Sequence, residues 1–239
     1  MRYEMAPLAI ESDRSERAAF IRRTYAHLAV AILAFIGIET MIFGVLRQMD
    51  PVGFDDTMFA MLRHPFSWLI VLGVFMGVSY LANYWAFNGG SPALQYAGLG
   101  LYVVAEALIF VPLLYIAIVY LNDFAVVAQA GILTLCLFAG LTAVVFFTRK
   151  DFSFLGPIIS IASFVALGFI ICAMIFGFTL GLLFALAMIV LASAAILYDT
   201  SNILHKFRTD QHVAASLSLF ASVALLFYYV LWALLQSRR

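Results

Sequence analysis

The sequence predicts an all-α membrane protein, a bundle of seven transmembrane helices. Of its 239 residues, 65% are hydrophobic and only 11% are charged, and the mean hydropathy is +1.06. Soluble domains contain about 45–50% apolar and about 25% charged residues, so a water-soluble fold could not bury this much apolar surface. Backbone groups must be paired inside the lipid, and the apolar runs are continuous rather than alternating, which favours helices over a closed barrel.

Seven apolar runs follow one another along the chain. They have 19 to 25 residues each, and about 20 residues are enough to cross the hydrocarbon core of a bilayer. The shortest break is Phe176–Thr179, where one long helix is the alternative; that helix would be about 75 Å long at about 1.5 Å per residue, so two spans joined by a tight turn fit better. The predicted spans are residues 28–46, 66–87, 94–118, 125–147, 155–176, 180–204 and 213–235.

The first 24 residues are polar and carry charges of both signs. They lack the short apolar core of a secretory signal. We therefore expect a cytosolic N-terminal tail over residues 1–24, followed by a single transmembrane domain over residues 25–239. A solvated, disordered leader would have the same composition. The candidate partner contacts in the tail are Arg14, Arg17, Arg22 and Arg23.

The basic residues are distributed unevenly between the two sides of the predicted bundle. With the N-terminus inside, nine of the 13 lysines and arginines lie in cytosolic segments and four lie on the outer side. The positive-inside rule therefore predicts a cytosolic N-terminus and a C-terminus outside. Because the formal net charge is zero, no overall field recruits nucleic acid.

Three acidic residues fall inside predicted spans: Glu39, Glu106 and Asp199. A charge at the bilayer centre costs about 3 kcal/mol on insertion scales, so such residues are candidates for function. Glu39 and Glu106 lie about 17 Å from the cytosolic ends of their helices, and Asp199 lies about one turn from the same surface. No span contains lysine or arginine, so burial favours the protonated carboxyl.

Protonated, buried carboxyls are typical of a proton sensor or a cation site. The alternative is that each carboxyl donates one hydrogen bond to a neighbouring helix and only holds the bundle together. A separate motif, Gly73-x-x-x-Gly77, predicts a close approach of the second span to another helix.

The sequence does not predict an enzyme. Tyr198-Asp199 is half of the signature of intramembrane aspartyl proteases, but the Gly-Asp pair that completes it is missing. There is also no Gly-x-Ser-Gly and no His-Glu-x-x-His. We therefore expect no catalytic residue, no cofactor and no firm metal site, with Asp199 as a candidate calcium-path residue.

Three motifs resemble those of the Bax inhibitor-1 family, and the resemblance covers nearly the whole chain. They are Arg22-Arg23-Thr24-Tyr25, Thr148-Arg149-Lys150-Asp151-Phe152-Ser153-Phe154-Leu155-Gly156, and Ala195-Ile196-Leu197-Tyr198-Asp199-Thr200-Ser201-Asn202-Ile203. Within the family the sequence resembles the bacterial YccA branch, whose members are inner-membrane proteins that bind and modulate the membrane protease FtsH. The resemblance implies FtsH as partner, the tail as the part that the protease engages, and a location in the bacterial inner membrane.

Other members of this family are described as pH-sensitive calcium leak channels, gated by two aspartates on the sixth and seventh helices and an arginine on the second. Asp199 matches the first aspartate, whereas Ser222 occupies the position of the second, and the second span contains no basic residue. One aspartate beside a serine cannot share a proton as two carboxyls do. The YccA branch also has serine there. A calcium or proton leak that uses Asp199 and Glu106 is therefore the alternative hypothesis, and a purely structural role is a third.

Overall fold

The computed structural model describes residues 7–63, 65–88 and 91–238. Seven of its helices are long and apolar enough to cross a membrane, which confirms the predicted fold class. The helices are α1 (Arg14–Met41), continued by the π-helical turn η1 (Ile42–Leu46) and by α2 (Arg47–Met49); α3 (Pro51–Arg63); α4 (Pro65–Asn88); α5 (Pro92–Tyr115), continued by the π-helical turn η2 (Ile116–Tyr120); α6 (Phe124–Thr148); α7 (Leu155–Phe176); α8 (Leu182–His205); and α9 (His212–Ser237).

The first helix begins earlier than the apolar pattern indicates. Helix α1 starts at Arg14, so residues 14–24 of the predicted tail continue the first spanning helix. Glu16 lies in the first turn, where a negative charge stabilises the helix dipole. The Arg17 guanidinium donates to the carbonyl of Ala9 at 2.6 Å, which fixes the preceding turn against the start of the helix.

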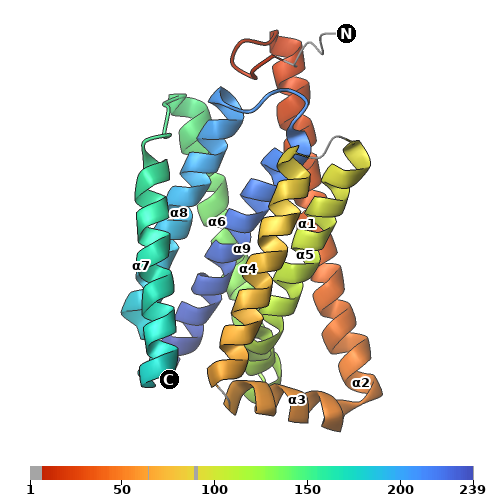
Figure 1. The fold of residues 1–239 in the computed structure, drawn as a ribbon, viewed down its shortest axis with the longest axis vertical. Helices are drawn as coiled ribbons and strands as arrows, with labels where there is room; N and C mark the ends of the chain where they lie inside the picture. Colours follow the sequence, from red (N-terminus) through yellow and green to blue (C-terminus); the bar gives the residue numbers. More distant parts are fainter. Residues whose placement is uncertain (1–6, 64, 89–90, 239) are drawn as a thin grey trace.

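Helix α3 is an element that the apolar runs do not predict. It has 13 residues, too few to cross a bilayer core, and it lies across the end of the bundle opposite the start of α1 (Figure 1). An ion pair between Arg47 and Asp55, with the nitrogen and oxygen 3.1 Å apart, joins α2 to this helix.

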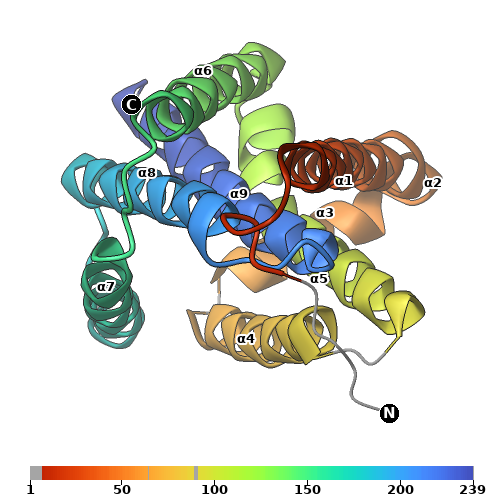
Figure 2. The same ribbon diagram turned by 90° about the horizontal axis from the view of Figure 1, so that it is seen from above.

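Helix α9 is the centre of the bundle. It contacts α1, α4, α5, α6 and α8, and Figure 2 shows the other helices arranged around it. Its fully buried side chains include Leu217, Leu219, Leu226 and Leu231. Helix α7 lies at the periphery and packs on α8 and α4. The beginning of α1 and the end of α9 lie at opposite ends of the bundle (Figure 1), and which end faces the cytosol stays a prediction.

Helices α4 and α5 approach each other closely at Gly98. A Cβ atom at Gly98 would lie 2.6 Å from the carbonyl oxygen of Ala82 and 2.9 Å from the amide nitrogen of Ala86. By contrast, Cβ atoms at Gly73 and Gly77 would meet nothing within 4 Å. The expected close approach at Gly73-x-x-x-Gly77 was therefore wrong, because α4 turns its buried Ala82 and Ala86, not these glycines, towards α5.

Candidate functional site

A hydrogen bond between α8 and α9 contains Asp199. The hydroxyl of Ser222 donates to the Oδ2 atom of Asp199, with the two oxygens 2.5 Å apart. Ser222 is buried and Asp199 is partly buried. The carboxyl oxygen accepts this bond whether or not the group is protonated, and the bond joins α8 to α9. Ser222, which the sequence places at the expected position of a second aspartate, is therefore the direct partner of Asp199.

Helix α5 contributes a second pair to the same region. Tyr102 and Glu106 lie one helical turn apart, both are buried, and the Tyr102 hydroxyl lies within interaction range of the Glu106 carboxyl. Tyr102 also lies close enough to Asp199 for an electrostatic interaction. We call Tyr102, Glu106, Asp199 and Ser222 the polar cluster. Two of the three predicted acids therefore lie in one polar cluster, built by α5, α8 and α9.

Glu39 lies apart from the polar cluster. Its side chain is buried, and neither carboxyl oxygen has a hydrogen-bond partner. One turn earlier on α1, Phe35 makes an edge-on contact with Phe110, with ring centroids 5.0 Å apart. The surroundings of Glu39 are therefore apolar, and no described contact joins it to Glu106 or Asp199.

The polar cluster favours a proton over a metal ion. Calcium takes six to eight oxygen ligands, whereas the described residues contain no group of three or more His, Cys, Asp or Glu side chains that could hold a metal. A carboxyl, a phenol and a hydroxyl all hold or donate protons. Asp199, Tyr102 and Glu106 are thus three neighbouring groups that can each hold a proton.

A second polar contact lies closer to the end of α8. The Ser201 hydroxyl accepts from the backbone N–H of Phe152 at 2.9 Å and donates to the Asp151 carboxylate at 3.4 Å. The backbone N–H of Ser153 donates to the same carboxylate and holds the pKa of Asp151 below its ordinary value. These bonds attach the loop between α6 and α7 to α8, two residues beyond Asp199.

The four candidate arginines of the predicted tail differ in their surroundings. Arg14, Arg22 and Arg23 are exposed. Arg17 instead bonds the backbone carbonyls of Ala9, Ile10 and Ser12. Arg17 therefore holds the chain before α1, whereas the other three present their charge to the surroundings.

The segment before α1 lies on the loop between α8 and α9. The N–H of Ala9 donates to the carbonyl of Phe207 at 2.9 Å, and the N–H of Thr209 donates to the carbonyl of Pro7 at 3.1 Å. Two segments that are far apart in the sequence are thus joined at one end of the bundle. Sequence reasoning missed this contact, because nothing in either segment indicates its partner.

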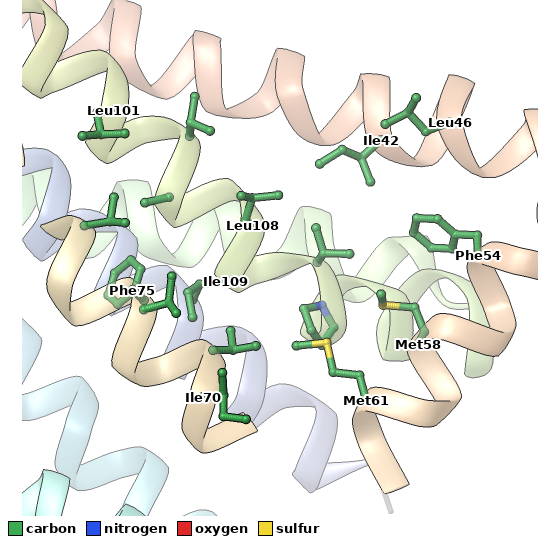
Figure 3. Close-up of a pocket in the computed structure, with 17 residues that line it drawn as sticks. Ile42, Leu46, Phe54, Met58, Met61, Ile70, Phe75, Leu101, Leu108 and Ile109 are labelled. Atoms are coloured by element: carbon green, nitrogen blue, oxygen red, sulfur yellow. The ribbon is translucent and has the colours of Figure 1, made fainter. Parts of the chain in front are cut away.

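A separate cavity of about 610 Å³ lies between η1, α3, α4 and α5 (Figure 3). All its lining residues are apolar, and neither Glu106 nor Asp199 nor Glu39 is among them. Several of the lining residues are exposed, including Ile70 and Leu108, so the cavity is an open apolar groove whose lining offers no polar side chain to an ion. Its lining residues include Ile42, Met58, Ile70, Phe75, Leu108 and Ile109.

Sequence reasoning also missed Tyr102. A signal was present, because Tyr102 and Glu106 are four residues apart and therefore share a helix face. Tyr102 carries no formal charge, and tyrosine is common in transmembrane helices, so the sequence did not mark it as a site residue.

The fold and the cluster together define a multi-pass membrane protein whose helices surround a buried polar cluster. The profile of the family described as "Inhibitor of apoptosis-promoting Bax1" matches residues 17–239. The chain belongs to this family, the Bax inhibitor-1 family, as its motifs predict.

Three relatives illustrate the range of similar proteins. "Uncharacterized protein PA2604" of Pseudomonas aeruginosa is 28% identical over 226 residues, which cover 92% of this chain and 90% of that protein. "Bax inhibitor 1" of Schizosaccharomyces pombe is 28% identical over 226 residues, covering 92% and 77%. "Protein lifeguard 4" of mouse is 29% identical over 140 residues, covering 56% of each chain.

Proposed function

We propose that this protein is a bacterial inner-membrane regulator that binds the protease FtsH and modulates the proteolysis of membrane proteins. The observation that carries the proposal is the first part of α1, which extends beyond the ends of the neighbouring helices (Figure 1). It presents the exposed Arg14, Arg22 and Arg23 at the end of the bundle predicted to face the cytosol. The motifs that resemble the YccA branch, and serine at position 222, support the same assignment.

Charge reversal of these arginines tests the proposal. Substituting Arg14→Glu, Arg22→Glu and Arg23→Glu together should lower the FtsH recovered with the purified protein about tenfold, equivalent to about 1.4 kcal/mol of binding. Substitution is preferable to deleting residues 1–24, because that deletion would remove the first turns of α1. The measurement is co-purification from native membranes, with FtsH quantified by mass spectrometry.

The matched control is Arg149→Glu with Lys150→Glu. Both residues are exposed and lie at the same end of the bundle, at the end of α6. Recovery should stay near the wild-type level. If no FtsH accompanies the wild-type protein, or if the triple variant recovers as much as wild type, the proposal is wrong.

A second function, a proton or cation leak, is favoured by the polar cluster. Asp199 and Glu106 both lie within interaction range of Tyr102 inside the bundle, and acids inside a membrane bundle often mark ion pathways. The donor set favours protons over calcium.

Flux into proteoliposomes tests this second function. Asp199→Asn and Glu106→Gln should each lower proton flux, recorded with an enclosed pH-sensitive dye, by about tenfold or more, because each removes a proton-binding group from the path. Glu39→Gln is the matched control and should leave the flux unchanged, since Glu39 lies outside the polar cluster. Calcium uptake at pH 6 and pH 8 is recorded in parallel. Flux unchanged in Asp199→Asn would remove the basis for this function.

A further inference from the structure

Three helices each direct one hydroxyl to the same buried place. Tyr25 of α1 lies within interaction range of the hydroxyls of Thr142 of α6 and Thr200 of α8. All three hydroxyl oxygens are buried, yet none has a hydrogen-bond partner in acceptable geometry. We call these three residues the hydroxyl triad. Their oxygens are near one another but too far apart or too poorly aligned to bond directly.

The two threonines of the hydroxyl triad depart from the common behaviour of hydroxyls in these helices. Ser and Thr side chains in helices often bond the carbonyl of the preceding turn. In this bundle Thr24, Thr40, Thr148, Ser160 and Ser193 do so, at 2.7–3.1 Å. Thr142 and Thr200 do not, although such a carbonyl is available to both. Ser79 and Thr134 are also unpaired. Thr142 and Thr200 differ from them because both lie beside the Tyr25 hydroxyl.

The positions of the threonines place the hydroxyl triad at one depth. Thr142 lies about 9 Å before the end of α6, and Thr200 about 8 Å before the end of α8. Both ends lie at the end of the bundle where α1 begins (Figure 1). The rings of Phe138 and Phe146 lie 6.4 Å and 6.0 Å from the ring of Tyr25, measured between centroids, and surround it with apolar groups.

Three unpaired hydroxyls in an apolar surrounding would each cost free energy. Leaving a buried hydroxyl unsatisfied costs about 1–3 kcal/mol. A buried water molecule makes about three hydrogen bonds, typically to buried polar groups that otherwise have no partner. The hydroxyl triad offers three such groups, and they converge on one place without bonding one another.

We infer that the hydroxyl triad binds a single internal water molecule that bridges α1, α6 and α8. Each hydroxyl can both donate and accept, so one water molecule satisfies all three. The bridge lies on α8 next in sequence to Asp199, but it uses a different face of the helix, towards α1 and α6 instead of α9. The water site stands independently of both proposed functions, since it requires neither FtsH nor ion flux.

Removal of single hydroxyls tests the inference through the sign of the stability change. If water bridges the triad, Tyr25→Phe, Thr142→Val and Thr200→Val should each lower the melting temperature by about 2–4 °C. Combining two of them should cost less than the sum, because the first already breaks the bridge. Thr40→Val is the control; its hydroxyl bonds its own helix at 2.7 Å and lies outside the site. A dry site predicts the opposite sign, since removing an unpaired hydroxyl stabilises the bundle.

Hydroxyl-radical footprinting by X-ray pulses gives a second measurement that does not depend on stability. Radicals formed from a bound water molecule label the side chain beside it, so Tyr25 should be labelled in the wild-type protein. The label should fall several-fold in the Thr142→Val, Thr200→Val double variant. Phe110, 1% exposed and without a hydroxyl, should stay unlabelled in both. A raised melting temperature in the single variants, or labelling of Tyr25 unchanged in the double variant, would overturn the inference.

Discussion

Replacing Gly98 with valine is expected to lower the free energy of unfolding by about 3 kcal/mol, at the upper end of the usual range for overpacking. A Cβ atom there would lie 2.6 Å from the carbonyl oxygen of Ala82 and 2.9 Å from the amide nitrogen of Ala86. Both are backbone atoms of α4, so no side-chain rotation relieves the clash and the two helices must separate. Thermal unfolding of the purified protein in detergent, followed by circular dichroism, measures the loss.

The control for this substitution is Gly100→Val on the same helix. A Cβ atom at Gly100 would meet nothing within 4 Å, and both substitutions place the same β-branched residue in α5. Gly100→Val should therefore stay within about 0.5 kcal/mol of wild type, as surface substitutions usually do. Equal losses for the two variants would show that helix propensity, not the contact with α4, is responsible.

Replacing Ser222 with alanine is expected to lower the free energy of unfolding by about 2 kcal/mol, because a buried acceptor that loses its donor costs about 1–3 kcal/mol. The substitution removes the hydroxyl that donates to Asp199 Oδ2 at 2.5 Å. The carboxyl then loses its donor from α9. Unfolding in detergent at pH 7 gives the stability.

Ser218→Ala on the same helix is the matched control. The hydroxyl of Ser218 bonds the carbonyl of Ala214, one turn earlier in α9, at 3.3 Å, so its loss breaks no contact between helices. We expect Ser218→Ala to stay within about 0.5 kcal/mol of wild type. A loss in Ser222→Ala no larger than this would mean that the bond to Asp199 contributes nothing measurable to stability.

The seven spans could be predicted because each is a continuous apolar run. A run of about 20 such residues is long enough to cross a bilayer, which distinguishes it from the helices of soluble proteins. Helix α3 could not, because its 13 residues mix apolar and charged side chains at a length that composition does not resolve. The start of α1 at Arg14 was missed for a related reason: apolar periodicity marks the part of a helix inside lipid, and this helix continues beyond it.

Part of the candidate site could likewise be predicted from the sequence, and part could not. Glu39, Glu106 and Asp199 could be selected because charged residues are rare in spans. Their grouping could not be predicted, since it depends on how each helix is rotated about its axis. Helices that are apolar on every side carry little signal of which face is buried. The sequence therefore could not separate Glu39 from the other two acids, nor bring Tyr25, Thr142 and Thr200 together.

The central position of α9 affects how the bundle assembles. Chains are made from the N-terminus, and the parts made first fold first. The helix that contacts α1, α4, α5, α6 and α8 follows all of them in the chain, so these helices cannot complete their packing before α9 is made. The core between them therefore closes only after α9 is inserted, and the order of translation becomes part of the folding pathway.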